Sequence, residues 1–240
     1  MAWAALVAGS LFGGFIQPIT GFGSAMIMVL FLSPALSMTL APSVTAGVCC
    51  ALSSVMLWRL RSSVDWRGAF LPVAVYTAVN IAVIRMLNAF DLRLLTIIFG
   101  AFLVVLSIYF LFFAKNASVK PTLLMAIVCS SVSGISAGLF SVGGPLMALY
   151  FIAASEKRET YVGNLQLLFA LTNAVSALMR GVGGFYPVSL LPMTLVGIVL
   201  INVGERIGAR VSGRVNAANF KTVVYIGVGV SGLLTLLGQL

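Results

Sequence analysis

The stretch that decides the fold is SAGLFSVGGPLMALYF, residues 136–151. It lies within the longer segment 121–155, which contains no charged residue. An uncharged segment of this length is typical of a membrane protein. Gly143, Gly144 and Pro145 are nevertheless the residue types least suited to a helix interior. The sequence therefore predicts that a helix is interrupted in the middle of the bilayer.

The composition indicates an all-α polytopic membrane protein. The chain has 240 residues, of which 61% are hydrophobic and only 8% are charged, far less charge than a soluble domain exposes. The net charge of +9 does not indicate nucleic-acid binding, because the basic residues stand at the ends of apolar segments, where they orient a membrane protein. We expect a lipid bilayer as the surroundings of the chain and no nucleic acid as a partner.

Charge-free windows predict the membrane spans. The segments 1–37 and 121–155 would each form a helix roughly 50 Å long at 1.5 Å per residue, which exceeds the roughly 30 Å of a bilayer core. Each segment is also short for two crossings and a turn, so both are expected to be broken, re-entrant helical hairpins. The other windows predict six full spans, at 42–59, 68–88, 93–114, 160–180, 186–206 and 219–239.

The two hairpin segments resemble each other and predict an internal repeat. The breaker GGFIQPITGFGS (13–24) corresponds to SGISAGLFSVGGP (133–145), and Pro72 corresponds to Pro192, at a common spacing of 120 residues. The chain is thus expected to consist of two copies, 1–118 and 119–240, each with one hairpin and three transmembrane helices. Matching breaks in two halves of a membrane protein indicate a transporter's binding site.

The distribution of Lys and Arg predicts the topology. If each hairpin returns to its own side, one face collects eleven basic residues and the other keeps three, the asymmetry of a cytoplasmic face. Both termini are then outside the cytoplasm, the two repeats are inverted, and one hairpin enters from each face so that the tips meet near the midplane. The eleven are Arg59, Arg61, Arg67, Lys115, Lys120, Lys157, Arg158, Arg206, Arg210, Arg214 and Lys221; the three are Arg85, Arg93 and Arg180.

Broken helices of this kind predict an anion site. Free N–H groups at the start of a half-helix converge on a ligand, and the helix dipole adds partial positive charge. For any single glycine, close helix packing is the favoured role; for two matched breaks, the site is favoured. Hydroxyls and amides add further donors, although helix–helix contact is the commoner role of such amides. The predicted substrate-binding residues are Gln17, Thr20, Gly21, Phe22, Gly23, Ser24, Ser141, Val142, Gly143, Gly144, Asn164 and Gln166.

The ionisable residues favour an anionic or polar substrate. The five acids, Asp65, Asp91, Glu156, Glu159 and Glu205, stand near segment ends, and there is no histidine. Pumps and cation carriers usually need carboxylates within the membrane. No catalytic or metal-ligating constellation is visible, so we expect no enzyme activity, no metal and no cofactor.

Two arginines on the sparsely charged face have two interpretations each. Arg180 ends an uncharged run of 20 residues. Its side chain either extends to the membrane interface, which is the favoured interpretation, or guards the entrance of an anion path. The same alternatives apply to Arg85.

At its breakers the chain resembles the sulfite exporter TauE/SafE family of membrane proteins. ITGFGSAMIMVLFLSP (19–34) is similar to the first glycine-rich segment of that family, GLFSVGGPLMALYF (138–151) to the second, and YVGNLQLL (161–168) to the helix start that follows. The sequence departs from the family pattern at Met28–Leu30, where a proline is usual, at Ser141, where glycine is frequent, and at Leu146, where a second proline is frequent.

The resemblance implies export of sulfite, an organosulfonate or another small sulfur-containing anion across a bacterial inner membrane. The mechanism we expect is alternating access, in which two inverted repeats rock around an anion held between the hairpin tips. An anion channel and a non-transporting membrane scaffold remain alternatives, and the oligomeric state is open.

Overall fold

The computed structural model describes residues 1–109, 111, 121–212, 229, 232–233 and 235–237. All regular structure in these residues is helical, which confirms the prediction of an all-α chain. The helices are α1 (Ala2–Thr20), α2 (Ser24–Leu32), α3 (Leu40–Leu60), α4 (Trp66–Arg85), α5 (Leu92–Ile108), α6 (Leu123–Phe140), α7 (Gly144–Ala154), α8 (Arg158–Val182) and α9 (Leu191–Val211), with 3₁₀ turns at Arg61–Ser63, Leu87–Ala89 and Val188–Leu190.

Six of the described helices are long and apolar enough to cross a membrane: α1, α3, α4, α6, α8 and α9. A multi-pass membrane protein is thereby supported. Four of these helices, α3, α4, α8 and α9, overlap predicted spans, whereas α1 and α6 fall within the segments predicted as hairpins. α5 has 17 residues, the lower limit for one crossing, and the predicted span 219–239 lies almost wholly outside the described residues. α1 and α6 are present instead, because the first arm of each predicted hairpin is itself 19 or 18 residues long.

Both segments predicted as hairpins are interrupted at their glycines. α1 ends at Thr20, and Gly21 and Gly23 follow with φ of 88° and 106°, a left-handed conformation that strains any residue with a Cβ. α6 ends just before Ser141, whose φ is 57°. α2 then packs against α1, and α7 packs against α6. Each segment is therefore a broken helical pair.

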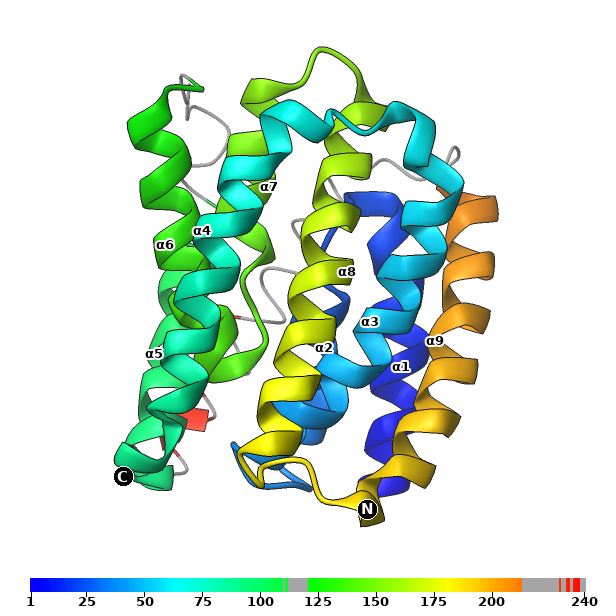
Figure 1. Cartoon of the computed structure of the whole chain (residues 1–240). Helices are drawn as coiled ribbons and strands as arrows, with labels where there is room; N and C mark the ends of the chain where they lie inside the picture. The colour runs from blue at the N-terminus through cyan, green and yellow to red at the C-terminus, as the bar shows by residue number, and fades with distance from the viewer. Residues whose placement is uncertain (110, 112–120, 213–228, 230–231, 234, 238–240) are drawn as a thin grey trace.

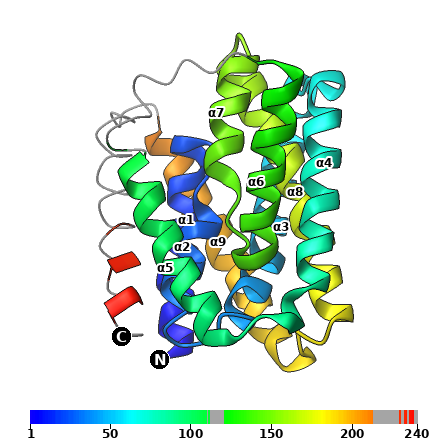
Figure 2. The same ribbon diagram turned by 90° about the vertical axis from the view of Figure 1, so that its left-hand side faces the viewer.

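The two broken pairs lie on either side of a central pair of helices. α3 and α8 pack against each other in the middle, α1 packs against α9 on one side, and α4 packs against α6 on the other (Figure 1). α1 runs upward from the lower end of Figure 1, whereas α6 runs downward from the upper end. Figure 2 shows α6 and α7 side by side, from a direction in which α4 and α8 lie to their right.

Several glycines permit close contact between neighbouring helices. A Cβ at Gly14 of α1 would collide with the carbonyl group of Ile201 in α9, and one at Gly204 of α9 would collide with the carbonyl group of Leu11. On the other side of the bundle, a Cβ at Gly134 of α6 would lie 2.8 Å from a carbonyl oxygen of α4. Small residues allow backbones to approach in this way in membrane proteins, so these glycines pack helices together and do not form a site.

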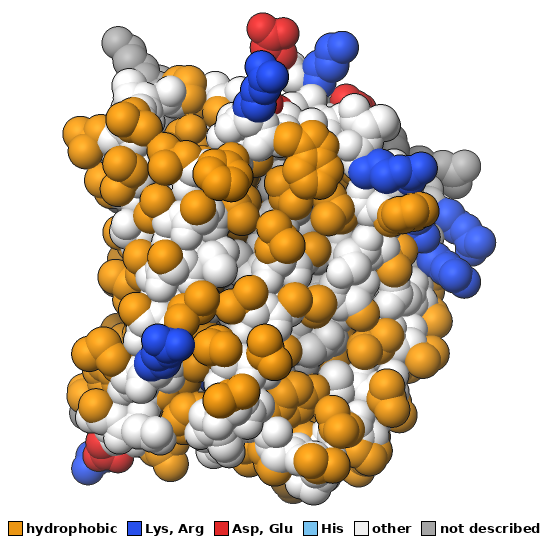
Figure 3. All heavy atoms as spheres, in the orientation of Figure 1, with side chains coloured by type: hydrophobic (Ala, Val, Ile, Leu, Met, Phe, Trp, Pro, Cys, Tyr) orange, Lys and Arg blue, Asp and Glu red, His pale blue; other side chains and the backbone are white. Residues whose placement is uncertain are grey.

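The surface is apolar around the middle and charged at the ends. Large hydrophobic side chains such as Phe70, Val105, Leu124 and Val199 are exposed, as expected for side chains that face lipid. Figure 3 shows most of the visible Lys and Arg side chains toward the upper end. Of the ten basic residues that the structure describes, seven belong to helix ends and connections at the upper end and three to the lower end.

Candidate functional site

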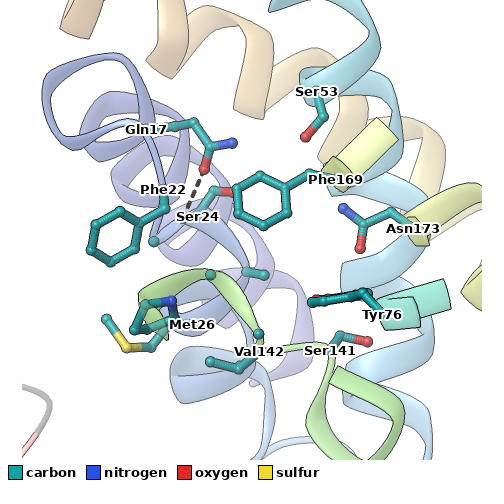
Figure 4. A pocket seen from close by; sticks show the side chains of 15 residues that line it. Gln17, Phe22, Ser24, Met26, Ser53, Tyr76, Ser141, Val142, Phe169 and Asn173 are labelled. Atoms are coloured by element: carbon teal, nitrogen blue, oxygen red, sulfur yellow. Dashed lines mark hydrogen bonds between the residues drawn. The ribbon is translucent and has the colours of Figure 1, made fainter. Parts of the chain in front are cut away.

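The two helix breaks, which lie far apart in the sequence, meet at one small cavity. Figure 4 shows this cavity, which has a volume of about 30 Å³, room for about two water molecules. Residues 22–26 of the first break and 141–145 of the second line it, together with Gln17, Ser53, Tyr76, Phe169 and Asn173 from α1, α3, α4 and α8. Of the predicted site residues, the structure brings eight to this cavity: Gln17, Phe22, Gly23, Ser24, Ser141, Val142, Gly143 and Gly144.

The lining residues largely correspond between the two halves of the sequence. Five pairs of lining positions are separated by 120 residues, the same spacing that relates the two breakers. Four of the pairs belong to the breaks themselves. The fifth joins α3 to α8, the central helices of the bundle. The pairs are Phe22 and Val142, Gly23 and Gly143, Ser24 and Gly144, Ala25 and Pro145, and Ser53 and Asn173.

Two helices begin at the cavity. α2 starts at Ser24 and α7 at Gly144, and the first N–H groups of a helix have no partner within it. The helix dipoles add partial positive charge at these ends. A Cβ at Gly144 would lie 3.1 Å from the Cβ of Phe22, so the two breaks are in direct contact. Both helix starts therefore direct donor groups toward one space.

The two helix starts differ in their capping. The amide of Ser24 donates to Oε1 of Gln17 (3.1 Å), so a carboxamide oxygen already occupies the start of α2. Among the described residues no side chain accepts from the first amides of α7, and Pro145 in its first turn has no N–H to donate. The N-terminus of α7 is therefore the less occupied of the two donor groups.

Gln17 also connects the first break to α8. Its Nε2 donates to Oε1 of Gln166 (3.1 Å), and Nε2 of Gln166 donates to the carbonyl oxygen of Gly21 (3.0 Å). The hydroxyl of Thr20 lies within hydrogen-bonding reach of the carbonyl groups of Ile16 and Phe22. Gln166, Gly21 and Thr20 were predicted as ligands; in the structure they do not line the cavity, because their polar groups hold the turn in place.

Asn164 is likewise not at the cavity. Its Oδ1 accepts a hydrogen bond from the amide of Asp65 (2.9 Å), in the connection between α3 and α4. Asn164 therefore joins α8 to that connection and does not line the cavity in this structure.

Three lining residues missing from the predicted set contribute polar groups. The Ser53 hydroxyl is fully buried and has no hydrogen-bond partner among the described residues, and Figure 4 shows it directed into the space between the two breaks. Asn173 and the buried Tyr76 face the same space (Figure 4). By contrast, the Ser141 hydroxyl donates to the carbonyl oxygen of Pro42 (2.9 Å) and so ties the second break to α3.

The two arginines of the sparsely charged end differ. Arg85 is exposed at the end of α4. Arg180 is fully buried, and its Nη2 donates to the carbonyl oxygens of Gly138 (2.6 Å) and Leu139 (3.3 Å). The favoured interpretation of Arg180, extension to the interface, is therefore wrong: the carbonyl groups at the end of α6 hold the guanidinium inside the protein.

Among the described residues, no carboxylate lines the cavity. Within the described residues there is also no group of three or more His, Cys, Asp or Glu side chains that could hold a metal ion. The polar groups of the lining are hydroxyls, the side-chain amides of Gln17 and Asn173 and backbone N–H groups, and the rings of Phe22 and Phe169 stand beside them. These groups can donate hydrogen bonds to a small polar or anionic molecule.

Comparisons with known proteins identify the family. Neither a curated protein nor a solved structure shows significant similarity to the chain. The family model of the sulfite exporter TauE/SafE matches residues 6–235, nearly the whole length. The resemblance seen at the glycine-rich breakers is thereby confirmed, and the chain belongs to the sulfite exporter TauE/SafE family.

Proposed function

We propose that the protein exports a small sulfur-containing oxyanion, sulfite or an organosulfonate, and that the anion binds in the cavity between the two helix breaks. Membership of a family of membrane transporters supports transport rather than catalysis. The observation that carries the proposal is the meeting of two helix N-termini, those of α2 and α7, at one cavity lined by a buried and unpartnered hydroxyl, that of Ser53. Such a hydroxyl costs free energy unless a ligand or water satisfies it.

The chemistry of the lining suits an oxyanion. Oxygen atoms of an anion accept hydrogen bonds from backbone N–H groups at the N-terminus of α7. The anion can approach the backbone closely there, because Gly143 and Gly144 have no side chain. The hydroxyl of Ser53 and the amide of Asn173 supply donors from the opposite wall. Since the described part of the chain places no carboxylate in the lining, negative charge on the ligand meets no carboxylate there.

The size of the cavity supports alternating access. A volume of about 30 Å³ leaves room for about two waters, so a sulfite ion of four heavy atoms requires a small displacement of the lining. Phe22 and Phe169 approach Gly144 from two sides. Movement of the two repeats relative to each other would open the cavity to one face and then to the other, as in other transporters with broken helices. A continuous channel would need a wider space.

The charge distribution supports an orientation. Seven of the ten described Lys and Arg residues belong to the upper end of Figure 1, and positive residues concentrate on the cytoplasmic side. We assign the upper end to the cytoplasm of a bacterial cell and both termini to the outside. The cavity residues Ser53, Tyr76 and Asn173 stand near the middles of α3, α4 and α8, so the site is at mid-depth.

Transport by the purified protein in liposomes tests the proposal. Sulfite, sulfate, thiosulfate and sulfoacetate are compared for saturable uptake and for counterflow, and electrical recording tests for single-channel currents. Gly144→Ala places a methyl group 3.1 Å from Phe22 and 3.2 Å from Phe169 and should raise the KM about tenfold or more by narrowing the site. Gly181→Ala is the matched control, because no atom lies within 4 Å of its Cβ.

Two results would contradict the proposal. The substrate assignment fails if the wild-type protein moves none of the four anions. The site assignment fails if Gly144→Ala and Gly181→Ala transport with the same KM as the wild type.

A further inference from the structure

Arg180 is a buried positive charge without a counter-charge in the described residues. The side chain near the end of α8 is 0% exposed. Its Nη1 donates to the carbonyl oxygen of Thr39 (3.5 Å) and its Nη2 to those of Gly138 and Leu139. Its Nε is buried and has no partner among the described residues. A buried charge that lacks an opposite charge is costly in a membrane protein and marks a functional site.

Asn80 of α4 presents a second unpartnered donor nearby. It is 0% exposed, and its Oδ1 accepts from the hydroxyl of Ser176 (2.9 Å), but its Nδ2 has no partner in the described part of the chain. Ser176 precedes Arg180 by one turn of α8. Gly138 of α6 lies close to both residues. Arg180 donates to the carbonyl oxygen of Gly138, and a Cβ on Gly138 would lie 3.1 Å from the backbone carbonyl oxygen of Asn80.

These residues continue from the cavity toward the lower end of the molecule. Asn173 lines the cavity, and Ser176 and Arg180 follow on α8 at steps of three and four residues. Residues at these steps share one face of a helix. One face of α8 therefore carries polar groups from the cavity to the end where α8 stops, with Asn80 of α4 beside it.

We propose that Arg180 and Asn80 form a second anion site, on the outward half of the transport path, which receives the anion from the cavity. This inference rests on the proposed function. Both unpartnered groups are N–H donors, which is the chemistry that binds an oxyanion and not a cation. The guanidinium supplies the charge, and the carbonyl groups that hold it fix its position.

Asn80→Asp tests the site. The variant retains the shape of the side chain but replaces an amide that donates to an anion with a carboxylate that repels it. The new carboxylate would take the place of the Asn80 amide beside Ser176, one turn of α8 before Arg180, and would bring a negative charge to the side of the missing counter-charge. The folded protein should become at least as stable as the wild type, whereas the KM for sulfite, measured in liposomes from the outward face, should rise about tenfold or more. Asn88→Asp is the control, since Asn88 is exposed at the same end.

A second variant covers the case in which Asn80→Asp does not fold. Asn80→Ala removes the free donor without adding charge and should raise the same KM severalfold. If the wild type transports sulfite and the folded Asn80 variants keep its KM at both faces, the second site is refuted while the proposed function stands. If the wild type transports none of the tested anions, the proposed function itself fails. A rise in KM in the Asn88 control equal to that in Asn80→Asp would also refute the site, because charge anywhere at this end would then account for the effect.

Discussion

Replacing Gln17 with alanine should weaken the fold and strengthen anion binding. The side chain is buried and makes two hydrogen bonds, from the Ser24 amide to Oε1 and from Nε2 to Gln166, both 3.1 Å long. Its Oε1 occupies the start of α2, the position that an oxygen of the substrate would take at a helix N-terminus. Gln17 thus competes with the substrate for the amide of Ser24.

The size of each effect follows from these contacts. A buried hydrogen bond contributes about 1 kcal/mol, and a buried group left without a partner costs about 1–3 kcal/mol. Losing both bonds should therefore lower the free energy of unfolding by about 2–4 kcal/mol. The freed amide of Ser24 then donates to the anion, and a hydrogen bond to a charged group contributes about 1.5–3 kcal/mol. Since about 1.4 kcal/mol is a factor of ten, the Kd for sulfite should fall about tenfold.

Gln17→Glu should act in the opposite direction on binding. Its carboxylate accepts from the amide of Ser24 and is stabilised by the dipole of α2, so it holds this helix start more firmly than the amide does. Its negative charge next to the cavity repels a second anion. Sulfite binding should therefore weaken about tenfold or more relative to the wild type.

Thermal unfolding at increasing sulfite concentration measures both quantities, and transport in liposomes gives the KM independently. Asn202→Ala is the control, because within the described residues the Asn202 side chain bonds only the carbonyl oxygen of Ile198 in its own helix (2.8 Å). If Gln17→Ala loses affinity, Gln17 is a ligand and not a competitor. If the alanine and glutamate variants change affinity in the same direction, the electrostatic reasoning is wrong.

Three further predictions concern stability and topology. Ser141→Gly should be more stable than Ser141→Ala by about 1 kcal/mol in denaturant unfolding, because both lose the bond to α3 but only glycine relieves the left-handed φ of 57°; equal stabilities would contradict this. Arg59→Ala, which leaves the buried carboxylate of Glu205 without its 2.8 Å partner, should destabilise by about 2 kcal/mol, a value reduced because Arg59 is half exposed. Adding Glu205→Gln should recover part of that loss, and strictly additive losses would show that the pair is not coupled. Cysteines introduced at the exposed positions Asn88 and Glu156 should react with impermeant thiol reagents from opposite sides of the membrane; labelling from one side would refute the proposed topology.

The sequence predicted the helix breaks well because their cause is local. Glycine at Gly21 and Gly23 permits the positive φ found there, and this property depends on no distant contact. The length of α1 was not predictable in the same way. Its last turn is held by α8, where Arg158 donates to the carbonyl oxygen of Pro18 (3.1 Å) and the Tyr161 hydroxyl to that of Thr20 (3.0 Å). Contacts between residues so far apart in the sequence determine where the turn ends, and hydropathy contains no information about them.

The lining residues of the candidate site were predictable from the sequence where the two repeats correspond. The spacing of 120 residues that relates Gly23 to Gly143 also relates Ser53 to Asn173, and applying it to the polar residues of the spans would have found this second pair. No such signal exists for Tyr76, because its place in the lining depends on how α4 is rotated against α6 and α8. The sequence does not show that Gln166 stands away from the cavity for a related reason: its partner Gln17 is 149 residues away, and only the folded chain brings the two amides together.

Some polar residues have no similar residue at the corresponding position of the other half, and these residues can make the two directions of transport unequal. If the two halves are inverted copies that alternate as proposed, positions related by the repeat exchange surroundings between the two states, and matched residues favour neither face. Gln17 corresponds to Ala137 and Arg180 to Leu60, so these polar side chains have no counterpart. Gln17 bonds the first break to α8, and Arg180 bonds the end of α6 near the lower end. Under the proposed alternating access, a difference in energy between the inward-facing and outward-facing states comes from such unmatched contacts. Gln17 and Arg180 are therefore the first residues to change in order to alter the ratio of the KM values at the two faces.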